Sequence, residues 1–167
     1  MELIVTVLTD DRPGVIEQVA ATIAAHGGNW LDSRLAQLAG KFAGIIAVAV
    51  PDQQAAALTA DLASLTDVVV HIAAAAAGPP PALQRHTLQV VANDRPGIVA
   101  EVSAALAGMG VNVAEMATSV EPASMSGGVI FRATLDLGLR PDQPLAAVVA
   151  GLEGLSEDLM IDLPQQS

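Results

Sequence analysis

The sequence predicts an α+β fold: two tandem ferredoxin-like βαββαβ units, each with a four-stranded antiparallel sheet and two helices on one face. Three observations support this. The run Asp-Arg-Pro-Gly occurs twice, at residues 11–14 and 94–97. Each copy follows a β-branched apolar run and precedes apolar residues at helical spacing. Between the copies, alanine repeats give way to Gly78 and three prolines, a composition typical of a semi-rigid extended spacer.

The two copies are related by internal duplication. An offset of 83 residues aligns residues 11–29 with 94–112 and gives nine identities in this window. Most differences preserve side-chain size, such as Ile23 against Leu106. Later in the chain, Pro51-Asp52 matches Pro141-Asp142 at an offset of 90, so the second copy carries seven extra residues. A surface hairpin between the second and third strands tolerates such an insertion best, around the sequence PASMSGG.

Each copy contains the same elements in the same order. Pro13 and Pro96 fit a first helical turn, where a missing N–H costs nothing. Asp11 and Asp94 then lie beside the N-cap, at the positive end of the helix dipole. The predicted first helices carry apolar residues at helical spacing and end at glycine: Val15, Ile16, Val19 and Ile23 before Gly27, and Ile98, Val99, Val102 and Leu106 before Gly110. The other predicted elements are first strands 3–9 and 87–93, second strands 30–38 and 113–120, third strands 42–50 and 128–137, second helices near 53–65 and 143–156, and last strands near 67–74 and 159–163.

These elements predict a first domain over residues 1–77, a Gly/Pro linker over 78–83, and a second domain over 84–167. Each domain has only about 80 residues, so its own hydrophobic core is marginal by size. Pairing the units with each other, or with a second chain, would bury additional apolar surface. We therefore expect a homodimer or a higher oligomer.

Composition excludes several functional classes. The formal net charge is −11, with only seven Lys and Arg, so a phosphate-neutralising surface is missing and direct nucleic-acid binding is not expected. There is no cysteine, and His26, His71 and His86 lack metal-ligand spacing, so we expect no metal site. No nucleophile motif and no phosphate-binding loop is present, which predicts a protein without catalytic residues or cofactor.

The same features bear on location. The N-terminal sequence lacks the basic segment and cleavage site of a secretory signal, and the longest apolar run is too short to span a bilayer. We expect a cytoplasmic protein without membrane contact.

The repeated turn has the features of an anion site. A helix N-terminus presents unpaired backbone N–H groups and partial positive charge, and Gly14 and Gly97 leave room for a ligand to approach. Asn29 and Asn112 offer amide donors and a carbonyl acceptor, but lie about 20 Å away at the far end of the helix. A ligand shared by turn and asparagine would therefore lie between two units. A second interpretation needs no ligand. The Asp-Arg-Pro-Gly run can serve only to start the helix, and the glycines before Asn29 can serve only to form a turn.

A strand leading into D-R-P-G and two hydrophobic residues, then a helix, G-x-N and a second strand, resembles the ACT domain, a small-ligand sensing module. Two tandem copies without a catalytic domain resemble the glycine cleavage system transcriptional repressor family. The resemblance implies units that associate through their sheets and bind amino acids at interfaces near the first turn. The residues implied are Asp11, Arg12, Pro13, Gly14, Val15 and Asn29 in the first copy, and Asp94, Arg95, Pro96, Gly97, Ile98 and Asn112 in the second.

These inferences predict a non-enzymatic regulator that senses a small amino acid, glycine or a similar one. The resemblance implies a protein partner such as a transcription factor, with indirect control of transcription. Two alternatives stay open: a structural or interaction module with vestigial ligand sites, and the detached regulatory subunit of an amino-acid metabolic enzyme.

Overall fold

The computed structural model describes residues 1–76, 78, 82–123 and 128–163. The chain divides into two compact units, residues 1–79 and 80–167. Part of the expected linker, residues 79–81, and part of the expected insertion hairpin, residues 124–127, lie outside the described residues.

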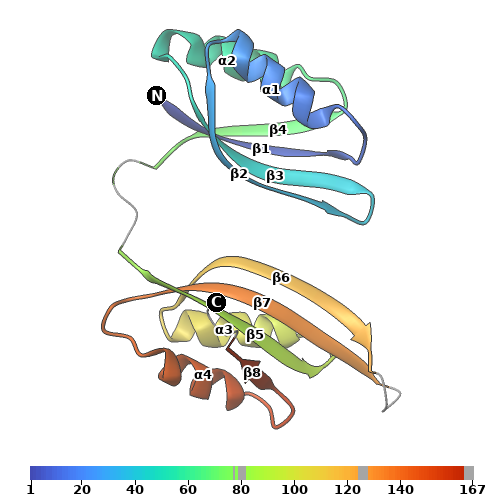
Figure 1. Ribbon diagram of the computed structural model, residues 1–167, viewed down its shortest axis with the longest axis vertical. Helices are drawn as coiled ribbons and strands as arrows, with labels where there is room; N and C mark the ends of the chain where they lie inside the picture. Colours follow the sequence, from blue (N-terminus) through green and yellow to red (C-terminus); the bar gives the residue numbers. More distant parts are fainter. Residues whose placement is uncertain (77, 79–81, 124–127, 164–167) are drawn as a thin grey trace. The chain divides into compact units, whose positions relative to one another are not determined.

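The first unit has two helices on one face of a four-stranded sheet (Figure 1). Its strand order is β2-β3-β1-β4, and every neighbouring pair is antiparallel. The elements are β1 (Glu2–Asp10), α1 (Val15–Ala25), β2 (Asn29–Leu38), β3 (Lys41–Ala49), the short 3₁₀ helix η1 (Asp52–Gln54), α2 (Ala55–Ala63) and β4 (Val68–Ala74).

The second unit repeats this topology, with strand order β6-β7-β5-β8 and antiparallel pairing throughout. Its elements are β5 (Gln84–Asn93), α3 (Ile98–Gly108), β6 (Asn112–Pro122), β7 (Val129–Leu139), α4 (Leu145–Glu153) and β8 (Met160–Asp162). Both units are therefore βαββαβ, which confirms the predicted fold class.

Each unit has its own hydrophobic core between its helices and its sheet. In the first, Val19 and Ile23 of α1 and Leu58 of α2 are buried against strand residues such as Val5 and Ile46. The second core uses the matching residues: Val102 and Leu106 of α3, Val148 and Leu152 of α4, and Leu88 and Leu135 of the sheet. Burial alternates along the central strand β1, as expected for a sheet with one covered face.

The start of each first helix differs from the sequence prediction. The helices begin at Val15 and Ile98, and the N-caps are Gly14 and Gly97, so each proline lies one residue before the cap rather than in the first helical turn. The carbonyl of Gly14 accepts the amide of Gln18, which is the first helical hydrogen bond. The predicted place of the two prolines was wrong because a proline followed by glycine suits a tight turn as well as a helix start.

The far ends of the first helices agree with the prediction. Gly27 and Gly110 have φ of 65° and 67°, and the amides of Gly28 and Val111 donate to carbonyls five residues earlier at 2.9 Å. This Schellman arrangement satisfies the last helical carbonyls. It also sets the direction in which the chain enters β2 and β6.

Candidate functional site

The first Asp-Arg-Pro-Gly run contains a tight turn over residues 12–15, in which Gly14 is at the third position. Gly14 has φ 91° and ψ −4°, close to the values that a type II turn requires there, and Pro13 precedes it in the position that such turns favour. The backbone amide of Asp11 donates to the carbonyl of Gly40 at 3.0 Å, which ties the turn to the β2–β3 hairpin. The turn is therefore held at both ends by backbone hydrogen bonds.

A surface pocket of about 340 Å³ lies at this turn. Its lining combines one guanidinium and two carboxylates with apolar side chains: Asp11, Arg12, Pro13, Gly14, Val15, Ile16, Glu17 and Phe42. Five of these eight residues are among the six that the sequence predicted for the first copy, and the sixth, Asn29, is not in the lining. Ile16, Glu17 and Phe42 were not predicted as site residues, and only the helical position of Ile16 and Glu17 next to the turn could have indicated them.

Ile16 is exposed, which contradicts its predicted place on the apolar face of the helix. Its side chain is 48 % exposed, and Val99 at the matching position of α3 is 41 % exposed. The face of each helix that packs on the sheet carries the buried positions 15, 19 and 23, with 98, 102 and 106 in the second copy. An apolar side chain thus lies in solvent beside both turns.

Charged groups surround the first turn. A guanidinium nitrogen of Arg12 donates to the carbonyl oxygen of Thr66 at 3.4 Å, the long end of the hydrogen-bond range. Lys41 forms an ion pair with Asp10 at the end of β1. The hydrogen bond and charge of Lys41, with a smaller contribution from Arg12, lower the pKa of Asp10. Lys41 is therefore paired with Asp10, and Arg12 is the cation in the lining of the pocket.

The second turn has the same backbone and different side-chain contacts. Gly97 has φ 93° and ψ −6°, and the amide of Ile98 donates to the carbonyl of Arg95 at 3.4 Å. Both guanidinium Nη atoms of Arg95 donate to the two carboxylate oxygens of Glu101, each at 2.6 Å. These hydrogen bonds lower the pKa of Glu101 and raise the pKa of Arg95. The amide of Asp94 donates to the carbonyl of Val129 at 2.8 Å, so this turn is also fixed to a hairpin strand.

The structure does not bring Asn29 and Asn112 to the turn of their own unit. Each is the exposed first residue of a second strand, beyond the C-terminal end of the 11-residue first helix, which spans about 16 Å. A register shift between Trp30 and Asp32 recurs between Val113 and Glu115, so both asparagines lie beside a bulge. The separation of turn and asparagine agrees with the sequence argument.

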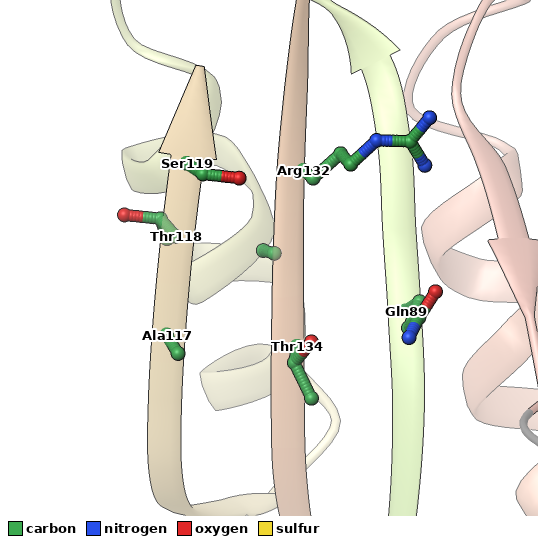
Figure 2. A pocket seen from close by; sticks show the side chains of 7 residues that line it. Gln89, Ala117, Thr118, Ser119, Arg132 and Thr134 are labelled. Carbon is green, nitrogen blue, oxygen red and sulfur yellow. The ribbon is translucent and has the colours of Figure 1, made fainter. Parts of the chain in front are cut away.

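Another pocket, of about 210 Å³, lies on the second sheet (Figure 2). Four of its polar lining residues lie on the face away from the helices: Gln89, Ser119, Arg132 and Thr134. Gln89 of β5 and Thr134 of β7 are cross-strand partners, and Ser119 of β6 pairs with Arg132 of β7. Figure 2 shows the Arg132 side chain extending from β7 toward β5. Its Nε lies 3.5 Å from a carboxylate oxygen of Glu121. None of these residues was predicted as a site residue, because only strand register brings them together.

Among the described residues, no group of three or more histidines and carboxylates is placed to hold a metal ion. No helix in the described part of the chain is long and apolar enough to cross a membrane.

The fold and the repeated turn define a protein of two ferredoxin-like units, each with the same helix-opening turn. The sequence model of the ACT domain matches residues 2–69, and a second ACT-domain model matches residues 86–148. The chain belongs to the ACT-domain family, whose members bind amino acids for regulation. Both predicted turns lie inside the matched segments.

Solved structures that match this chain include two that cover almost its whole length with high structural similarity. A protein of unknown function from Galdieria sulphuraria is 28 % identical, with a TM-score of 0.85, and the match covers 97 % of this chain and 96 % of that one. A protein provisionally described as a glycine cleavage system transcriptional repressor is 17 % identical, with a TM-score of 0.70, over 97 % of this chain and 95 % of that one. At that identity the likeness shows the fold alone. No curated protein matched the sequence.

Proposed function

We propose that this protein is a non-enzymatic, cytoplasmic regulator that binds a small amino acid at the Asp-Arg-Pro-Gly turn. The observation that carries the proposal is the lining of the first pocket. A free amino acid is a zwitterion, and the pocket offers the Arg12 guanidinium to its carboxylate and the carboxylates of Asp11 and Glu17 to its ammonium group. Apolar side chains, including Ile16, complete the lining.

Assembly is part of the proposal. The turn is open to solvent, and Asn29 lies at the far end of its helix. A second copy of the chain that placed its asparagine against the turn would supply the missing amide donors and cover the exposed Ile16. The amino acid would then favour the assembled state, because it binds that state more tightly.

The regulatory output is proposed to be a protein contact. Glycine or a similar amino acid is the first candidate effector, and a transcription factor is the first candidate partner. A net charge of −11 supports indirect rather than direct control of transcription.

The test is a thermal-shift screen of the twenty amino acids, with glycinamide as a control that lacks the carboxylate. An amino acid at about 100 times its dissociation constant stabilises the folded state by about 2.7 kcal/mol. We expect a rise in melting temperature with one or a few small amino acids and none with glycinamide. The absence of any shift at millimolar concentration would refute amino-acid sensing.

A second measurement separates sensing from a constitutive interaction module. In this measurement, the purified chain is used to capture its protein partner from cell extract, once with and once without the amino acid that gives the thermal shift. Capture that changes with the amino acid supports regulation. Equal capture in both samples contradicts it and favours the module with vestigial sites.

A further inference from the structure

The two turns share four residues but differ in the charge that faces their arginine. At an offset of 83, Glu101 in α3 corresponds to Gln18 in α1. Glu101 holds Arg95 in a two-pronged ion pair, with both N···O distances at 2.6 Å. Gln18 carries no charge, and within the described part of the chain Arg12 makes one hydrogen bond, to the Thr66 carbonyl at 3.4 Å.

The pair between Arg95 and Glu101 has the geometry of ligand recognition. A guanidinium binds a carboxylate best through two parallel N–H···O bonds, and this is what Arg95 makes with Glu101. A ligand carboxylate at the second turn would have to displace one already attached to the same chain. Such an intramolecular competitor acts at an effective concentration of about a millimolar or more.

Arg12, the first arginine, has no such bound carboxylate from its own helix position and lies at a pocket. Weakly bonded Arg12 lines the pocket with Asp11 and Glu17, and Asp10 close by is engaged by Lys41. The residue that matches Glu17 in the second copy is Ala100, so the carboxylate available for an ammonium group is also absent from that position. The first turn thus offers both charges of a zwitterion.

We propose that only the first turn binds the amino-acid effector, and that Glu101 closes the second turn by occupying Arg95 in place of a ligand. We call residues 18 and 101 the selector residues. Glutamine at this position leaves the arginine able to bind a ligand carboxylate, and glutamate occupies the arginine itself. The inference rests on the proposed function and adds that the two copies are not equivalent.

The test exchanges the two selector residues. Isothermal titration with glycine, serine and leucine, each measured separately, gives the number of sites per chain. We expect one site in the unmodified chain, and binding weakened at least tenfold in Gln18→Glu. Glu101→Gln should add a second, weaker site, because Asp94 matches Asp11 but Ala100 still stands where the first copy has Glu17. Arg12→Gln should abolish binding, while Arg95→Gln should leave it unchanged.

We expect all four variants to fold, so a change in binding reports on the site. Arg95 and Glu101 are 36 % and 44 % exposed, and an exposed ion pair contributes little to stability, so all four variants should keep the circular dichroism spectrum and melting behaviour of the unmodified chain. If the unmodified chain binds and Gln18→Glu binds equally well, the selector role is wrong while amino-acid sensing stands. If neither the unmodified chain nor any variant binds, sensing and the selector role are both wrong.

Discussion

Single residues decide the shape of the turn on which the candidate site is built. Gly14 and Gly97 have φ of 91° and 93°, a region where a side chain collides with its own backbone. The free space around Gly97 does not change this, because the strain is local to the backbone. Pro96 before it sets φ near −65°, which suits the preceding turn position. The Pro-Gly pair therefore favours this turn locally, and backbone hydrogen bonds to the neighbouring hairpin fix its position.

Gly97→Ala should lower the free energy of unfolding by about 1–2 kcal/mol, the cost of a left-handed conformation for an L-residue. Urea denaturation followed by circular dichroism measures it. Gly108→Ala is the control: it lies at the end of α3 with open space around its Cβ position, and alanine there should be neutral or stabilising. Equal losses in both variants would show that the Gly97 conformation is not the cause.

At the scale of elements, the two units join their helices with different chemistry. In the first unit, His26 after α1 lies with Nε2 2.8 Å from a carboxylate oxygen of Asp61 in α2, and Nδ1 3.3 Å from the amide oxygen of Gln54. In the second unit, the offsets place Met109 and Gly151 at the positions of His26 and Asp61. A Cβ added to Gly151 would lie 2.8 Å from the Met109 sulfur, so these two residues pack closely. One junction is polar and titratable, and the other is apolar.

The polar junction should make the first unit sensitive to pH. The hydrogen bonds to Asp61 and Gln54 raise the pKa of His26 above its ordinary value of about 6.5. A raised pKa in the folded state means that this stabilisation is fully present below pH of about 6.5 and is lost as pH rises through the folded pKa. The melting temperature should therefore fall as the pH rises from about 6.5 through the folded pKa of His26. In Asp61→Asn the melting temperature should depend less on pH. An NMR titration of His26 locates its pKa, and a value at or below 6.5 would contradict the assignment.

At the scale of the molecule, one duplicated unit has diverged on the open face of its sheet. The first open face carries Ala36, Ala43 and Ile45 where the second carries Ser119, Arg132 and Thr134. The helix-covered faces, by contrast, keep aliphatic residues at matching positions. Selection for a core thus preserved one side of each sheet and left the other free to change.

The net charge of −11 gives a prediction for the whole chain. In an electrophoretic mobility assay, about 10 µM protein should not retard a DNA duplex, because binding to phosphates needs clustered Lys and Arg. A basic DNA-binding protein of known affinity serves as the positive control. Retardation that weakens as salt is raised would show direct DNA contact and would contradict indirect control of transcription.

The sequence by itself determined the elements, their order and the position of both turns. These signals are local: the spacing of Val15, Val19 and Ile23 marks a helix face, and the positive φ at Gly27 follows from a glycine at a helix end. Duplication made them stronger, because every local signal occurs twice. The family and the fold class follow from such patterns, and the turn residues of the candidate site do as well.

Only the tertiary structure decided how the two turns differ. Gly14 caps α1, so the helix begins after Pro13, and Ile16 lies on an exposed part of it. The side-chain geometry of α3 brings Glu101 onto Arg95. The pocket that contains Gln89 and Arg132 depends on strand register between residues more than forty positions apart. Contacts of this kind are set by packing and by side-chain conformation, which depend on the whole folded unit, and a one-dimensional pattern does not contain them.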